Sequence, residues 1–218
     1  MVRKANSPLE GISRRPESRA ADARALAALR KRAAACRNCD LWKRGTQTVF
    51  GAGPADAALM LVGEQPGDQE DLAGKPFVGA AGRVLADALQ QAGIDANRVY
   101  ITNAVKHFKW TAKGKRRIHE RPNREEILAC RMWLEGEIAH VHPRVIVALG
   151  ATAAGTLAGP KIKVTKDRGR PIDSPLAPMF TVTVHPSSIL RAPSDEQRHE
   201  AMRLFVKDLK TVARWLKK

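Results

Sequence analysis

The sequence predicts an α/β protein, a three-layer α/β/α sandwich with a central four-stranded parallel sheet. Four short runs rich in β-branched and aliphatic residues recur along the chain, at 58–64, 99–105, 144–150 and 179–185. Segments with helical periodicity separate these runs, and each run ends in polar groups. Alternating strands and helices imply a parallel sheet covered on both faces, and such sheets bind ligands beyond the carboxyl ends of their strands.

The part of the chain before the first strand divides into two segments. Residues 1–17 combine charges, serines and prolines with little apolar periodicity, so we expect a disordered basic arm. The alanine-rich stretch near 18–35 predicts the first helix of one folded domain over 18–218. A chain of 218 residues is long enough to bury a core without disulfides or a second subunit, and we expect a monomer.

Three further helices are expected. The first has an apolar face formed by Ala81, Leu85, Ala88, Leu89 and Ala92. The second is capped by Asn123, with Glu126 at capping-box spacing. Its apolar positions are Ile127, Leu134, Ile138 and Val141. The last helix, over 202–216, carries one apolar stripe with basic residues outside it, which predicts an amphipathic cover for the sheet.

The chain is strongly basic, with a formal net charge of +16. Its basic residues gather at 113–121, 161–170 and 203–218, which predicts a polyanionic partner. The alternatives are a solubility charge or attraction to an anionic membrane surface. No uncharged run approaches the roughly 20 residues that cross a bilayer, and no signal peptide is recognisable. We therefore expect no membrane association and a cytoplasmic, nucleoid-associated location.

The three cysteines form a candidate metal site. Cys36 and Cys39 make a CxxC pair, Cys130 is the third cysteine, and His107 ends an apolar run. An odd count with one tight pair favours metal ligation in a reducing compartment over disulfides. The spacing suits zinc or an iron–sulfur cluster equally, and the alternative is three unrelated buried thiols.

Polar side chains stand where predicted strands end. Glu64, beside Gln65, could orient a nucleophile or stabilise developing positive charge, or could simply belong to a turn. The glycine-rich stretch that follows is no nucleotide phosphate loop, because Gln69 and Pro76 replace residues that this motif requires.

Asn103 and His185 end two other strands. The Asn103 amide could satisfy backbone groups, or could read a nucleobase by accepting from uracil N3–H and donating to O4, which cytosine cannot match. Phe77 could stack on a flipped base or belong to the core. His185 could donate a hydrogen bond to a carbonyl oxygen that becomes negative as the base leaves.

The segment KGKRRIHERP lacks helical or strand periodicity, and a solvated basic loop is its default interpretation. The functional interpretation is a loop that grips phosphates through Lys115, Arg116 and Arg117 and projects His119 toward a sugar. Neighbouring positive charges favour the neutral, nucleophilic form of that imidazole.

Taken together, several segments resemble the uracil-DNA glycosylase superfamily: GEQPG, KPFVGAAG, TNAVKH, KRRIH, LGATAA and HPSSILR. The resemblance covers roughly residues 30–217. KRRIH, with His107 after NAVK, resembles the UdgX branch, which is related to the iron–sulfur enzymes of family 4. The resemblance implies a 4Fe–4S cluster held by Cys36, Cys39, His107 and Cys130. Ordinary iron–sulfur members of the superfamily have a cysteine at the position of His107.

The resemblance also implies an activity. Uracil is excised from single-stranded or double-stranded DNA, and the protein then stays covalently attached to the deoxyribose C1′ through His119 instead of releasing an abasic site. Glu64 and His185 join His119 as catalytic residues, Gln65, Phe77 and Asn103 bind the base, and Ser187 joins the three basic residues of KRRIH at the DNA. The alternatives are a conventional glycosylase that turns over, and a non-catalytic binder of uracil-DNA or, with zinc, of DNA in general.

Overall fold

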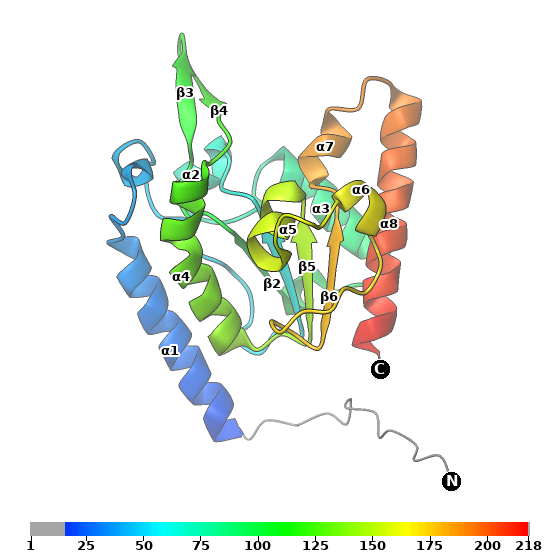
Figure 1. Ribbon diagram of the computed structural model, residues 1–218, viewed down its shortest axis with the longest axis horizontal. Helices are drawn as coiled ribbons and strands as arrows, with labels where there is room; N and C mark the ends of the chain where they lie inside the picture. The colour runs from blue at the N-terminus through cyan, green and yellow to red at the C-terminus, as the bar shows by residue number, and fades with distance from the viewer. Residues whose placement is uncertain (1–15, 218) are drawn as a thin grey trace.

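A computed structural model describes residues 16–217 of the protein (Figure 1). The first helix, α1 (Pro16–Ala34), begins two residues before the expected start of the folded domain at residue 18. The rest of the expected basic arm, residues 1–15, lies outside the described residues. Within residues 16–217, no helix is both long and apolar enough to span a membrane.

A four-stranded parallel sheet forms the centre of the molecule, in the order β2-β1-β5-β6. The strands are β1 (Leu59–Gly63), β2 (Val99–Asn103), β5 (Val145–Leu149) and β6 (Met179–Thr183). Each lies within a run predicted from the sequence. Every residue of β1 and β5 is buried, because helices cover both faces and leave no solvated side.

The two faces of the sheet pack against different helices, so the three-layer prediction is confirmed (Figure 1). One core joins alternate strand residues to α1, α4 (Arg124–Val141) and α5 (Ala151–Ala158). The other joins the intervening strand residues to α3 (Ala80–Gln91) and α8 (Asp195–Leu216). The capping box of α4 is also confirmed, since the Asn123 side chain accepts from the Glu126 N–H at 2.9 Å.

Short helices fill the connections. They are η1 (Asp40–Lys43), α2 (Asp68–Ala73), η2 (Ala96–Arg98), α6 (Val164–Asp167) and α7 (Pro186–Leu190). Of these, α2 and α7 follow β1 and β6 at the carboxyl edge of the sheet and frame the pocket described below.

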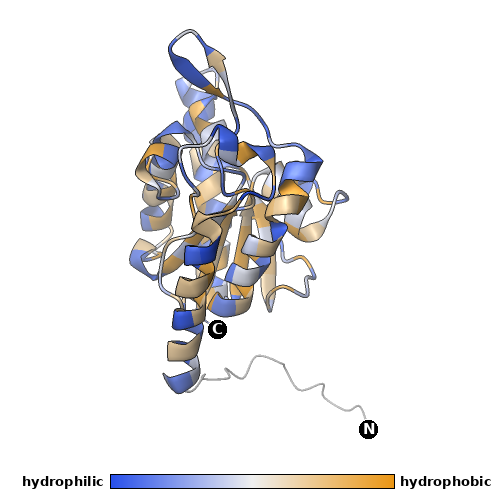
Figure 2. Cartoon of the chain, turned by 90° about the vertical axis from the view of Figure 1, so that its left-hand side faces the viewer, coloured by the Kyte–Doolittle hydropathy of each residue, from blue (hydrophilic) through white to orange (hydrophobic). Residues whose placement is uncertain are grey.

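The expectation of a loop without strand structure at KGKRRIHERP is wrong. β3 (Trp110–Lys113) and β4 (Arg116–His119) form an antiparallel hairpin that projects beyond the sheet (Figure 1). Gly114 takes a φ of 58° at the first position of the two-residue turn, where left-handed backbone favours glycine. Much of this hairpin is hydrophilic (Figure 2), so it carries no apolar alternation that would mark it as strand.

Candidate active site

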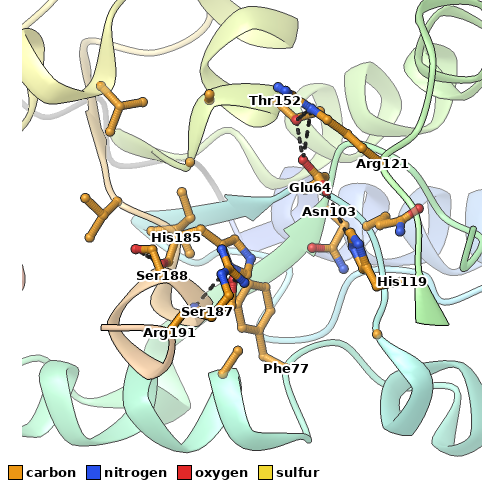
Figure 3. Close-up of a pocket in the computed structure, with 18 of the residues that line it drawn as sticks. Glu64, Phe77, Asn103, His119, Arg121, Thr152, His185, Ser187, Ser188 and Arg191 are labelled. Carbon is orange, nitrogen blue, oxygen red and sulfur yellow. Dashed lines mark hydrogen bonds and ion pairs between the residues drawn. The ribbon is translucent and has the colours of Figure 1, made fainter. Parts of the chain in front are cut away.

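The carboxyl ends of the strands open into a pocket of about 760 Å³ (Figure 3). The parallel register places Gly63, the last residue of β1, opposite Asn103, the last of β2. Seven residues predicted from the sequence line this pocket: Glu64, Gln65, Phe77, Asn103, His119, His185 and Ser187. The hairpin supplies His119, Asn103 is the last residue of β2, and the other five lie in the segments that follow β1 and β6.

Asn103 lines the pocket and has an acceptor without a partner. The residue is only 2% exposed, and its buried Oδ1 has no hydrogen-bond partner. A Cβ on Gly63 would lie 2.3 Å from that oxygen and 2.8 Å from Cζ of Phe77, so glycine leaves the space that both side chains occupy. Buried acceptors are nearly always paired, so a lone one on a residue that lines a pocket is suited to a ligand N–H.

The Phe77 ring is held beside this amide by an unusual backbone. Phe77 has a φ of 55°, which is costly for a bulky side chain. Gly82 permits it, because a Cβ there would lie 1.8 Å from the Phe77 carbonyl oxygen. The ring centroid lies 5.8 Å from that of His185. The two rings therefore form one wall of the pocket (Figure 3).

His185 is a neutral hydrogen-bond donor at neutral pH. Burial, reinforced by the charges of Arg191 and His119, lowers the pKa of His185 to about 4. Its Nδ1 accepts from the Ser187 N–H at 3.2 Å and lies 2.8 Å from the Ser187 hydroxyl. Because an acceptor nitrogen carries no proton, the proton of the neutral ring is on Nε2.

Glu64 links the sheet to the hairpin. Its Oε1 lies 3.4 Å from Nε2 of His119. Its Oε2 accepts a hydrogen bond from the Thr152 hydroxyl, and Arg121 donates to that hydroxyl at 3.0 Å (Figure 3). A carboxylate in this place can orient an imidazole and take up its proton.

The base of the hairpin is fixed by Gln65. Its Nε2 donates to the Glu120 carbonyl at 2.9 Å, and its Oε1 accepts from the Lys109 N–H at 3.1 Å. Both amide ends are thus used on the backbone that flanks the hairpin. Gln65 lines the pocket and also helps to hold His119 in place.

A comparison with protein families matches residues 50–210 to the uracil DNA glycosylase superfamily. The chain belongs to the uracil-DNA glycosylase superfamily. It is 39% identical over 184 residues to a type-4 uracil-DNA glycosylase of Thermotoga maritima, covering 84% of this chain and 90% of that protein. It is 37% identical over 166 residues to the type-4 uracil-DNA glycosylase of Pyrobaculum aerophilum, covering 73% of this chain and 81% of the relative.

Within this superfamily fold, the three basic residues predicted to contact DNA lie outside the pocket. Lys115 and Arg116 are exposed near the hairpin tip. Arg117 turns back toward α2, where its Nε lies 2.6 Å from Asp68 and its Nη1 lies 2.7 Å from Asp71. Arg117 therefore anchors the hairpin, and contact of these residues with DNA stays a prediction.

Of the predicted metal ligands, Cys36 and Cys39 follow α1, Cys130 lies on α4, and His107 lies in the connection after β2. Cys36, Cys130 and His107 are buried, and Cys39 is half-buried. Within residues 16–217, no three His, Cys, Asp or Glu side chains lie close enough together to hold a metal ion. Ligands of one zinc ion must converge to about 4 Å from one another. Thiolates on a 4Fe–4S cube stand farther apart, because each binds a different iron.

The chemistry of these donors fits such a cluster. Trp133 Nε1 donates to the Cys36 sulfur at 3.1 Å, and the Lys106 N–H donates to the Cys130 sulfur at 3.1 Å. Hydrogen bonds of this kind stabilise cluster thiolates. Burial chiefly raises the pKa of Cys130 to about 12, so the thiolate needs a cationic partner.

His107 is also prepared as a ligand. Burial lowers its pKa, which keeps the ring neutral. The Thr48 hydroxyl gives its single proton to the Ala33 carbonyl at 2.9 Å, so Nε2 of His107 must donate to Thr48 at 3.0 Å. Nδ1 of His107 then keeps its lone pair for a metal.

Sequence analysis missed the role of Thr152 and assigned none to Arg121. Thr152 lies in LGATAA, a segment used only for its resemblance, and Arg121 lies near the end of KGKRRIHERP, beyond the basic residues that were given a role. The available signal was the position of Thr152, two residues after Gly150 at the end of a strand, which places it in the first turn of a helix at the pocket edge.

Proposed function

We propose that this protein excises uracil from DNA and then remains covalently bound to the deoxyribose through His119. The observation that carries the choice of base is the unpaired Oδ1 of Asn103. It can accept from uracil N3–H while Nδ2 donates to O4. Cytosine would set its own N3 acceptor against that oxygen, so excision of the wrong base would leave buried polar groups unpaired. The names of the type-4 relatives support the same substrate.

The remaining pocket side chains suit the departure of the base. Phe77 offers a ring on which a flipped base can stack. The Nε2 proton of His185 can donate to a carbonyl oxygen as the C1′–N1 bond breaks and its electron pair leaves with uracil. Because the imidazole is already neutral and fixed by Ser187, it needs no reorganisation during the reaction.

Capture by His119 follows from its position beside Glu64. A ring nitrogen bonds to C1′ as the uracil anion departs, and the imidazole passes its ring proton to Glu64. Uracil gains one proton from solvent, so the number of protons balances. A nucleophile held in alignment can act at an effective molarity of roughly 10⁵ to 10⁸ M, which exceeds that of water. A protein linked in this way acts once.

We further propose that a 4Fe–4S cluster is bound by Cys36, Cys39, His107 and Cys130. The support is the donor chemistry of the four side chains, including the hydrogen bonds that the Cys36 and Cys130 sulfurs accept. The cluster would supply cross-linking of the segments around the pocket, with no part in bond breaking. Brown protein with about four irons per chain, and little zinc, is the expected result of metal analysis; zinc alone would contradict it.

The deciding experiment uses a labelled oligonucleotide with one uracil, single-stranded in one arm and duplex in another. After incubation the sample is heated in denaturing detergent and run on a gel. A retarded band that requires uracil is the expected result, and His119→Ser should instead yield an oligonucleotide that breaks after alkali. Alkaline breakage without a retarded band in the wild type would mean ordinary turnover. An intact oligonucleotide would favour a non-catalytic binder.

A further inference from the structure

We propose that Thr152 is a positioning residue that turns one oxygen of Glu64 toward His119, and thereby sets how often excision ends in a covalent adduct. This inference rests on the proposed function. Thr152 contacts Glu64 Oε2, whereas the opposite oxygen, Oε1, lies 3.4 Å from His119 Nε2. The two oxygens of one carboxylate thus have separate partners (Figure 3).

The direction of the hydrogen bonds is fixed by the groups involved. Arg121 Nε can only donate, so the Thr152 hydroxyl accepts from it at 3.0 Å. The hydroxyl has one proton, which must then go to Glu64. Arg121, Thr152 and Glu64 therefore form a one-way relay that ends on Oε2.

Thr152 is well placed to hold a neighbour still. It is 6% exposed and lies in the first turn of α5. The residue before that helix is Gly150, whose N–H donates to the Thr183 carbonyl at 2.8 Å and whose φ is 90°. A Cβ on Gly150 would lie 2.9 Å from Cβ of His185, so the start of α5 is packed closely against the end of β6.

Glu64 needs such a partner because the terminal torsion of a glutamate is broad. Without the Thr152 hydroxyl, Arg121 could approach the carboxylate directly, from its present 3.7 Å, and draw it away from His119. The Arg121 side chain is 67% exposed and so has room to move. The Thr152 hydroxyl thus fixes Oε2 of Glu64 and also binds the Arg121 guanidinium, which keeps Arg121 from bonding directly to the carboxylate.

The chemical consequence concerns a competition at C1′. Once uracil has left, either a His119 nitrogen or a water oxygen bonds to the carbon. Attack by His119 yields the adduct, and its ring proton goes to Glu64. Attack by water yields an abasic site and also releases one proton. A carboxylate turned away from His119 no longer aligns the ring, so the share of water attack rises.

The test measures both products on one gel in single-turnover reactions of the full protein with uracil-containing oligonucleotide. Thr152→Val keeps the shape and removes the hydroxyl, and Thr152→Ser keeps the hydroxyl and serves as the matched control. We expect Thr152→Val to lower the ratio of adduct to abasic product about tenfold, the effect of one hydrogen bond to a charged group. Thr152→Ser should keep the wild-type ratio within about twofold.

A purely structural role would lower both products in proportion and leave their ratio unchanged, which would overturn the inference. The inference would also be overturned if Thr152→Ser lost the adduct as fully as Thr152→Val. If Thr152→Val does not melt like the wild type, Arg121→Gln decides. The Arg121 side chain is exposed, so we expect this variant to fold. It removes the group that donates to the Thr152 hydroxyl and should therefore lower the ratio of adduct to abasic product. A wild-type ratio would contradict the relay from Arg121 through Thr152 to Glu64.

Failure of the inference is distinguishable from failure of the proposed function. Wild-type and His119→Ser lanes accompany every variant. A wild type that forms no adduct contradicts the covalent function itself and with it the inference. A wild type that forms the adduct, next to a Thr152→Val with the same ratio, contradicts the inference alone.

Discussion

Arg117, on the hairpin that carries His119, forms an ion pair with Asp71, a residue of α2 whose side chain is wholly buried. Nη1 of Arg117 lies 2.7 Å from Oδ2 of Asp71, and its guanidinium also lies 5.5 Å from the Phe108 ring centroid. An ion pair with one fully buried partner is costly to break, because the carboxylate stays desolvated. The position of His119 therefore depends on a contact between two residues that are 46 apart in the chain.

We predict that Arg117→Met lowers adduct formation more than DNA binding. Asp71 would keep two hydrogen bonds from Thr46, so we expect a loss of about 2 kcal/mol in unfolding free energy. The matched control is Lys115→Met at the exposed hairpin tip. It should weaken DNA binding and reduce the salt dependence of the binding constant by about one counterion. If Arg117→Met instead changed the salt dependence as Lys115→Met does, Arg117 would be a phosphate contact.

Gly63→Ala should disable base recognition while the fold persists. The new Cβ would meet Asn103 Oδ1 at 2.3 Å and the Phe77 ring at 2.8 Å, and both must shift. Displacement of a reading group by about 1 Å can cost on the order of 10² in rate, so we expect that loss in single-turnover uracil excision. Gly155→Ala is the control, since its Cβ meets nothing within 4 Å. Equal rates for the two variants would show that Asn103 and Phe77 do not read the base.

The sheet and much of the pocket could be predicted because their signals are local. Strands covered on both faces read as continuous apolar runs, and a parallel topology brings Glu64, Asn103 and His185 to one edge. The hairpin could not be predicted, since it is held by Arg117 and by Gln65 rather than by an apolar face. Nor could the role of Thr152, whose partner Glu64 lies 88 residues away.

Lys106→Met should be strongly destabilising. The Lys106 ammonium is fully buried and donates to Glu137 at 2.5 Å, to Thr102 at 2.7 Å and to the Asn103 carbonyl at 2.7 Å. Removal of one partner from a buried ion pair costs about 3 to 5 kcal/mol, measured as the unfolding free energy in urea. Lys113→Met, on the exposed hairpin, should stay within about 0.5 kcal/mol of the wild type. A comparable stability of both variants would mean that Glu137 finds other donors.

The stability of the protein should fall as pH drops from 6.5 to 4, in part through His185. Burial lowers the pKa of His185 from 6.5 to about 4, so in this window the unfolded chain binds a proton there and the folded chain does not. The stabilising contribution is complete above pH 6.5 and is lost as pH falls to about 4. This contribution to the unfolding free energy amounts to about 3 kcal/mol.

His185→Asn should flatten the dependence of the unfolding free energy on pH by that amount, measured by urea unfolding at pH 4, 5.5 and 7. The control is His199→Asn, which removes an exposed histidine on α8. Parallel profiles for the wild type and His185→Asn would mean that His185 is protonated as readily in the folded protein as in the unfolded chain. The neutral imidazole that is proposed to donate to the leaving base would then be absent at mildly acidic pH.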